Sequence, residues 1–185
     1  MTKLRSLKFN LMKKKLRSTK NIHYRDGSAS DLDQMMRLAY LSWKEYKSKL
    51  TEENWNRLKG TLENSDTYIE LLNMSQCILC ETTEKEVVGM AFLVPNGHPT
   101  YIYEKTWSYI RFVSVNPTFR GQKIGKTLTE KCINYARGNN EKIVALHTSE
   151  MMESAISIYE KLGFTIKREL EPRLGKKYWL YILEL

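Results

Sequence analysis

Hydrophobic residues in this chain follow two different spacings, and the spacing separates predicted strands from predicted helices. Residues 109–115 are rich in β-branched and aromatic side chains, which predicts a strand. Asn116 and Pro117 end it, because proline has no N–H to donate to a strand ladder. After a short loop, apolar residues recur at helical spacing up to Gly138, where the helix is expected to end. The expected apolar stripe of this helix is Ile124, Leu128, Cys132, Tyr135 and Ala136.

The same spacings predict the other elements of the chain. Thr51 and either Ser28 or Ser30 are expected to cap two early helices, because a hydroxyl can accept a hydrogen bond from the free N–H groups of a helix start. Further strands are expected at 21–25, 77–81, 87–94, 143–146, 164–170 and 176–185, and a further helix from Ala155 onward. The element order is therefore β-α-α-β-β-β-α-β-α-β-β, and 185 residues suit one domain with a sizeable core.

A glycine loop joins the central strand to its helix, with the sequence Arg-Gly-Gln-Lys-Ile-Gly-Lys at 120–126. The first N–H groups of a helix have no partner within the helix, and the helix dipole is positive there. Gly121 and Gly125 allow the backbone to approach an anion closely, and Lys123 and Lys126 are among the side chains that add positive charge. The loop therefore predicts a phosphate-binding site without identifying the phosphate.

Two common phosphate motifs do not fit this loop. A P-loop has four residues between its glycines, whereas three separate Gly121 from Gly125. The strand at 143–146 is followed by His147 and Thr148 rather than by an aspartate that could bind magnesium. The dinucleotide pattern G-x-G-x-x-G is absent from the chain. A nucleotide hydrolase and a dinucleotide-binding protein are both disfavoured.

The loop resembles motif A of the GNAT superfamily, the acyl-CoA-dependent N-acetyltransferases. Val115-Asn116-Pro117 and the spacing from Arg120 to Gly125 match the motif, with Lys123 in place of its middle glycine. The segment 155–164, which ends in Tyr-Glu-Lys-Leu-Gly-Phe, is similar to motif B of the family. The resemblance covers residues 22–185.

The resemblance implies a GNAT-like acyl-CoA N-acyltransferase fold of the α+β class, a mixed, mostly antiparallel twisted sheet flanked by helices. In that fold the strands of Val113 and Val144 run parallel and then splay apart. The implied activity is transfer of an acetyl group from acetyl-CoA, as co-substrate, to a primary amine. Tyr159 matches the family's proton donor to the leaving thiolate, and no metal is implied. The residues expected to bind coenzyme A are Val113, Val115, Arg120, Gly121, Gln122, Lys123, Ile124, Gly125 and Lys126.

The general base and the acceptor are less defined. Tyr109 stands where some members carry a glutamate, which leaves Glu104, His147 or a water chain as substitutes, and Glu104 is taken as the catalytic candidate. Met152 replaces an asparagine that many members use to reach the cofactor. Aromatic residues of the first two helices and of the loop 98–107, with nearby acidic residues, would suit a cationic amine. A small-molecule or a peptide amine, including polyamines, aminoglycosides, amino acids and protein N-termini, remains open.

A non-catalytic alternative also remains open. Lys123, Met152 and the absent glutamate favour a protein of the same shape that senses acyl-CoA or binds a partner without turnover. The intact Tyr159 and the Arg120-Gly121 pair favour an enzyme. A homodimer is compatible with either hypothesis.

The net charge of +9 is confined to the beginning of the chain. Residues 1–25 hold nine basic residues and no acidic one, whereas the remainder holds 21 of each. Residues 1–20 are therefore predicted as a basic extension of the domain 21–185, and nucleic acid or membrane contact is expected only through them. Three cysteines and the lack of an apolar leader indicate the cytoplasm. Cys77 and Cys80 are interpreted as core residues, because positions i and i+3 of a strand face opposite sides.

Overall fold

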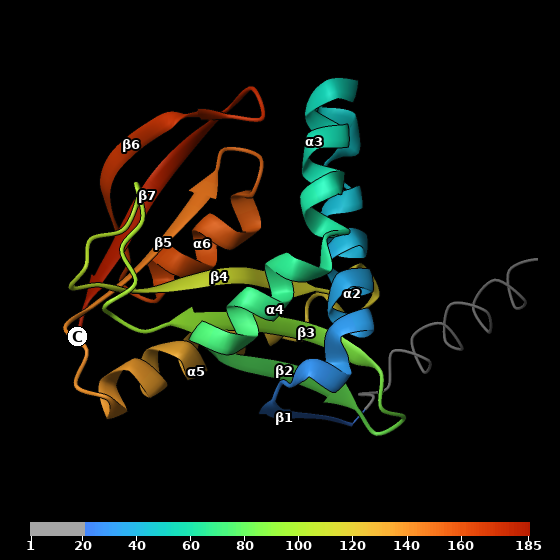
Figure 1. Ribbon diagram of the computed structural model, residues 1–185, viewed down its shortest axis with the longest axis horizontal. Coiled ribbons are helices and arrows are strands. Elements are labelled where there is room, and N and C mark those ends of the chain that lie inside the picture. Colours follow the sequence, from blue (N-terminus) through green and yellow to red (C-terminus); the bar gives the residue numbers. More distant parts are fainter. Residues whose placement is uncertain (1–20) are drawn as a thin grey trace, which may run out of the picture.

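The computed structural model describes residues 21–185, which form one seven-stranded sheet with helices on both faces (Figure 1). The predicted basic extension 1–20 lies outside the described residues. The strands are β1 (Ile22–Asp26), β2 (Gln76–Thr82), β3 (Val87–Val94), β4 (Ser108–Val115), β5 (Ile143–Ser149), β6 (Thr165–Arg173) and β7 (Lys176–Glu184). The α-helices are α2 (Leu32–Lys44), α3 (Glu52–Leu62), α4 (Ser65–Met74), α5 (Ile124–Gly138) and α6 (Glu153–Lys161), with short 3₁₀ turns η1 (Ala29–Asp31), η2 (Lys47–Lys49) and η3 (Pro117–Phe119).

The strand order is β1-β2-β3-β4-β5-β7-β6, and every neighbouring pair is antiparallel except β4 and β5. This confirms the mixed, mostly antiparallel sheet. One helix was not predicted: α4, between α3 and β2. The Asn64 side chain caps it by accepting from the Asp66 N–H, and only Tyr68 and Leu71 are buried along its ten residues. Two buried positions make too short a stripe to stand out from the polar residues around it.

The sheet separates two apolar cores. Helices α2, α3 and α4 cover one face, with Met35, Trp55 and Tyr68 against it, and α5 and α6 cover the other. Cys77 belongs to the first core and Cys80 to the second, which confirms that the two cysteines of β2 face opposite sides.

One residue of the predicted α5 stripe was wrong. Tyr135 is 46% exposed, and Ile133 takes the buried position instead, 4% exposed. The remaining members of the stripe are buried. At the start of α5, a Cβ on Gly89 would lie only 2.6 Å from Ile124 Cγ2, so the absence of a side chain on β3 lets the helix approach the sheet closely.

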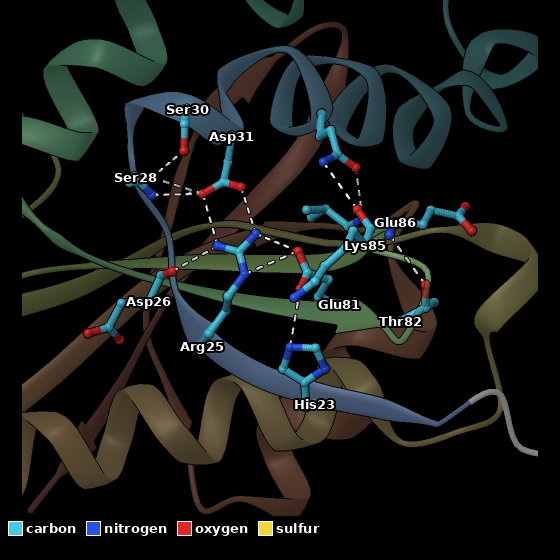
Figure 2. A network of polar contacts seen from close by, with 12 residues as sticks. His23, Arg25, Asp26, Ser28, Ser30, Asp31, Glu81, Thr82, Lys85 and Glu86 are labelled. Atoms are coloured by element: carbon cyan, nitrogen blue, oxygen red, sulfur yellow. Dashed lines mark hydrogen bonds and ion pairs between the residues drawn. The ribbon is translucent and has the colours of Figure 1, made fainter.

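A polar network joins the edge strand β1 to β2 and to η1 (Figure 2). The Arg25 guanidinium donates to both carboxylate oxygens of Asp31, at 2.9 and 2.7 Å, and to Glu81 Oε1 at 2.6 Å. His23 Nε2 and Lys85 Nζ approach Glu81 Oε2 at 3.1 and 3.4 Å. Hydrogen bonds from Arg25 hold the pKa values of Asp31 and Glu81 below their ordinary range.

Strands β4 and β5 pair only at their beginnings. Ser108 lies opposite Val144 and Tyr109 opposite Ala145, and no further pairs join the two strands. Strand β5 continues by pairing with β7 along its whole length. From Ile110 onward, the β5-facing edge of β4 therefore has no ladder partner, which is the splay implied by the family resemblance.

Candidate active site

A cleft of about 910 Å³ lies where β4 and β5 separate. Its lining comes from the exposed edge of β4, the glycine loop, α6, the helices α2 and α3, and the β6–β7 hairpin. In Figure 1, α3 and the β6–β7 hairpin rise on two sides of β4, and residues of both line the cleft. Tyr101 and Ile102 also line it, as expected for the loop 98–107.

The glycine loop has the backbone of an anion site. Gly121 and Lys123 have φ values of +79° and +62°, and Lys123 is the N-terminal cap of α5. The first helical hydrogen bond runs from the Thr127 N–H to the Lys123 carbonyl, so the N–H groups of residues 124–126 have no partner within the helix. These free donors and the positive end of α5 suit the diphosphate of coenzyme A.

Not every predicted loop residue offers its side chain to the cleft. Ile124 is 2% exposed and packs into the core, so only its backbone is available to a ligand. The Lys126 side chain pairs with Glu130 at 3.2 Å, and Gln122 and Lys123 are exposed. Gly121 and Gly125 line the cleft with their backbone.

Arg120 also lines the cleft, and its side chain is already paired. Its guanidinium forms a bidentate ion pair with Glu45, the residue that follows α2, with Nη2 at 2.5 Å from Oε1. The sequence did not point to Glu45, because 75 positions separate the two residues. The pair connects the glycine loop to the end of α2 beside the cleft.

A bulge in β4 shapes the next part of the cleft. Phe112 has a φ of +51°, and Phe112 and Val113 together oppose a single residue of β3, Ala91. After this extra residue, Val113 and Val115 both pack toward the α5 core, and both line the cleft. The two predicted pantetheine-binding residues therefore lie on the strand edge that the splay leaves unpaired.

Tyr159 reaches the cleft from α6. Its side chain is 7% exposed and packs edge-on against Phe164, with ring centroids 5.9 Å apart. Gly163, at φ +92°, ends the helix, and the Phe164 N–H donates back to the Tyr159 carbonyl at 3.1 Å. Burial raises the pKa of the Tyr159 phenol, which keeps it protonated. Motif B is thus a helix end that fixes the tyrosine in place.

Glu104, the predicted catalytic carboxylate, lies elsewhere. It is exposed on the loop before β4, and the cleft lining does not include it. Its carbonyl accepts a hydrogen bond from the Trp107 N–H at 3.1 Å, which shows a turn residue. The geometry gives no support to Glu104 as the base.

His147 does line the cleft, in a fully bonded state. Its Nδ1 lies 2.6 Å from the Tyr103 hydroxyl and its Nε2 lies 3.1 Å from Arg173 Nη1. Arginine can only donate, so Nε2 must be the acceptor and the ring proton sits on Nδ1. Removal from water, together with the nearby Arg111 and Arg173, lowers the pKa of His147 to about 3. A neutral imidazole with Nε2 occupied is poorly suited to act as a base.

Sequence reasoning missed the charged residues of the cleft beyond Tyr159. Within the part of the chain that the structure describes, the cleft is lined by a single carboxylate, that of Glu171. The arginines opposite it come from α3, β4 and β6, so no local motif announces them. This lining differs from the expected acidic surroundings of a cationic amine. The arginines are Arg57, Arg111, Arg168 and Arg173, in addition to Arg120.

A model of the acetyltransferase (GNAT) family matches residues 32–164, so the chain belongs to this family. Human N-acetyltransferase 8B is 30% identical over 119 residues, which are 62% of this chain and 52% of that protein. The chain thus spans about half the length of this curated relative.

Solved structures show the same fold. The PaiA N-acetyltransferase of Thermoplasma acidophilum, in complex with coenzyme A, superposes with a TM-score of 0.72 at 16% identity, over 89% of this chain and 99% of that one. The ribosomal-protein-alanine N-acetyltransferase of Brucella melitensis has a TM-score of 0.68 at 22% identity, over 88% and 99% of the two chains. These identities support the shared architecture.

Two further classes of site were sought in residues 21–185. No group of three or more histidine, cysteine or acidic side chains there could hold a metal ion. No helix among the same residues has both the length and the apolar character needed to cross a membrane.

Proposed function

We propose that this chain transfers the acetyl group of acetyl-CoA to a primary amine by direct attack of the amine on the thioester. One observation carries the proposal: the unpaired edge of β4, the free N–H groups at the start of α5, and Tyr159 all meet at one cleft. They supply, in order, hydrogen-bonding groups for an amide-containing arm, a diphosphate site and a proton donor.

The chain's residues divide the work along the cleft. The N–H groups of residues 121–126 hold the diphosphate, and the backbone of Val113 and Val115 aligns the pantetheine arm as an added strand would. This alignment brings the thioester carbonyl toward an amine in the wider part of the cleft. Since a thioester is already activated, positioning supplies most of the acceleration.

Tyr159 completes the reaction. As the amine nitrogen forms its bond to the acetyl carbon, the carbon–sulfur bond breaks, and the phenol gives its proton to the departing thiolate. Coenzyme A leaves as a thiol and the acetylated amine as an amide. The raised pKa of Tyr159 ensures that the proton is present when the thiolate forms.

The cleft also favours the reactive form of the amine. Five guanidiniums and one carboxylate line it, and surrounding positive charge lowers the pKa of a bound ammonium. The amine therefore enters neutral, or loses its proton to water, without a dedicated base. We expect kcat/KM to rise with pH until the acceptor is fully deprotonated.

Two measurements test the proposal. Acetyl-CoA should raise the melting temperature of the protein, and a thiol-release screen over an amine panel should find turnover. Absence of any stabilisation by millimolar acetyl-CoA would remove the proposal. Stabilisation without turnover on any amine would favour the sensor hypothesis.

The remaining assignments are proposals at a coarser level. Acceptors among the similar proteins, from a ribosomal protein to the substrate of an N-acetylaspartate synthetase of Xenopus tropicalis, are too varied to carry over by likeness. A cytoplasmic location, a homodimer and contacts through residues 1–20 stay predictions from the sequence.

A further inference from the structure

The part of the cleft beyond Tyr159 has an unbalanced positive charge. Arg57 comes from α3, Arg111 from β4, and Arg168 and Arg173 from β6, so three separate elements direct guanidiniums to one cleft. Among the described residues, the ion pairs of the structure join none of these four to a carboxylate. Unpaired cations of this kind attract an anionic group of a ligand.

Arg173 is held in place by a neutral chain of side chains. Its Nη1 donates to His147 Nε2 at 3.1 Å, and His147 Nδ1 in turn bonds the Tyr103 hydroxyl at 2.6 Å. Tyr103 is 2% exposed and stacks on Tyr109, with ring centroids 4.0 Å apart and planes 11° apart. The guanidinium also lies 5.8 Å above the Tyr178 ring. These contacts orient the side chain and leave its charge uncompensated.

Arg111 joins Arg173 at this end of the cleft. It lies immediately before the β4 bulge, with its guanidinium 5.7 Å from the Phe112 ring, and both arginines act electrostatically on His147. A planar guanidinium fork matches a carboxylate in a bidentate geometry, which a lysine cannot reproduce. Two such forks around a neutral histidine suit one carboxylate.

We infer that the acceptor is an amine that also bears a carboxylate, bound by Arg173 together with Arg111, as in an α-amino acid or a conjugate of one. The inference depends on the proposed acetyl transfer and specifies its substrate class. The same arginines repel a polyamine or an aminoglycoside, whose other ammonium groups would remain charged in the cleft.

Matched pairs of acceptors test this inference. We would measure thiol release from acetyl-CoA with a panel of L-amino acids and with the amide of each, because the amide keeps the amine and the side chain and removes only the negative charge. The expected result is a kcat/KM at least 10-fold higher for the acid than for its amide on the best acceptor. Equal or better use of the amides would overturn the inference and leave acetyl transfer intact.

Variants then connect the preference to Arg173. Arg173→Gln should raise KM for the acid about 10-fold or more with little change for the amide, and Arg173→Lys should restore part of the loss. Arg37→Gln, an exposed arginine on α2 outside the cleft, is the matched control and should keep the wild-type ratio. An unchanged acid-to-amide ratio in Arg173→Gln would contradict the assignment of this residue.

His147 acts through Arg173, so it is a positioning residue. His147→Gln should raise KM for the acid and spare KM for acetyl-CoA, a split that general unfolding would not produce. Parallel increases in both KM values would argue against the positioning role.

A binding measurement separates the two proposals. Calorimetric titration of N-acetylated amino acids and N-acetylated amino-acid amides, with coenzyme A present, requires no turnover. Tighter binding of the acids, lost in Arg173→Gln, would support the carboxylate site even if the amine panel gave no thiol release. Thiol release without any preference for acids would instead remove the carboxylate site alone.

Discussion

Among the individual residues, Tyr159 combines burial with access to the cleft. Its phenol is removed from water by α6 and Phe164, and its raised pKa keeps the proton on the oxygen at neutral pH. A group in this state can donate its proton once and must then regain it from solvent. This is the behaviour that a leaving thiolate requires.

Replacing Tyr159 by phenylalanine tests the assignment. Tyr159→Phe removes one oxygen from a packed ring, so the fold should persist while kcat falls by roughly 10²–10⁴-fold. KM for acetyl-CoA should change little, since the diphosphate site is untouched. Tyr135→Phe on α5 is the control, because Tyr135 is exposed and lies outside the cleft lining. Full activity in Tyr159→Phe would exclude it as the proton donor.

Lys123 shows a different cost at the residue scale. Its left-handed conformation, φ +62°, disfavours a non-glycine residue by about 1–2 kcal/mol. Lys123→Gly should therefore raise the free energy of unfolding by about 0.5–1 kcal/mol, since glycine's greater freedom in the unfolded chain offsets part of the gain. Urea titration measures this change.

Lys123→Ala separates backbone strain from charge. Alanine removes the ammonium group but keeps the strained backbone, so this variant should show no gain in stability. If alanine stabilised the protein as much as glycine does, charge repulsion in the loop rather than the left-handed conformation would be the cause.

At the scale of elements, the site depends on how closely α5 approaches β3. A Cβ on Gly89 would meet Ile124 Cγ2 at 2.6 Å and Cys80 Cβ at 3.0 Å, so a side chain there must displace the start of the helix. The same helix start carries the proposed diphosphate donors. Packing in the core and binding in the cleft are therefore coupled through one glycine.

Gly89→Ala should lower the free energy of unfolding by about 1–3 kcal/mol, as overpacking does, and should weaken the thermal stabilisation by acetyl-CoA. Gly60→Ala in α3 is the matched control: nothing lies within 4 Å of its added Cβ, so it should stabilise the helix by about 0.5–1 kcal/mol. Unaltered coenzyme response in Gly89→Ala would show that α5 and its loop tolerate the shift.

For the whole molecule, stability should fall in acid in two stages. The pKa of His147 is lowered to about 3, so the native state resists a proton that the unfolded chain accepts below about pH 6.5. Native Asp31 and Glu81 also have lowered pKa values, and their contribution is lost as pH falls below about 4. The free energy of unfolding, measured by urea titration from pH 7 to pH 3, should decrease throughout.

Two variants assign the two stages. His147→Gln should flatten the dependence between about pH 6.5 and pH 4, where one such group contributes at most about 1.4 kcal/mol per pH unit. Asp31→Asn should flatten the dependence below about pH 4, because it removes one carboxylate of the Arg25 network. Unchanged slopes in both variants would refute these assignments.

Several features could be predicted because they depend on neighbours in sequence. The bounds of β3 and α5, the Thr51 cap and the left-handed demand on Lys123 all follow from local spacing, capping or loop chemistry. Motif B likewise encodes its own helix end at Gly163. The helix α4 escaped prediction because its buried stripe is only two residues long.

The chain by itself therefore determined the order of its elements, the family and the diphosphate loop, since periodicity and turn chemistry act over a few residues. Only the tertiary structure decided the separation of β4 from β5, the pairing of Arg120 with Glu45, and the gathering of arginines from α3, β4 and β6. Those features join residues far apart in sequence, and packing of the sheet and its helices sets their distances. The acceptor end of the cleft is accordingly a property of the fold, whereas the coenzyme end is already written in a short stretch of sequence.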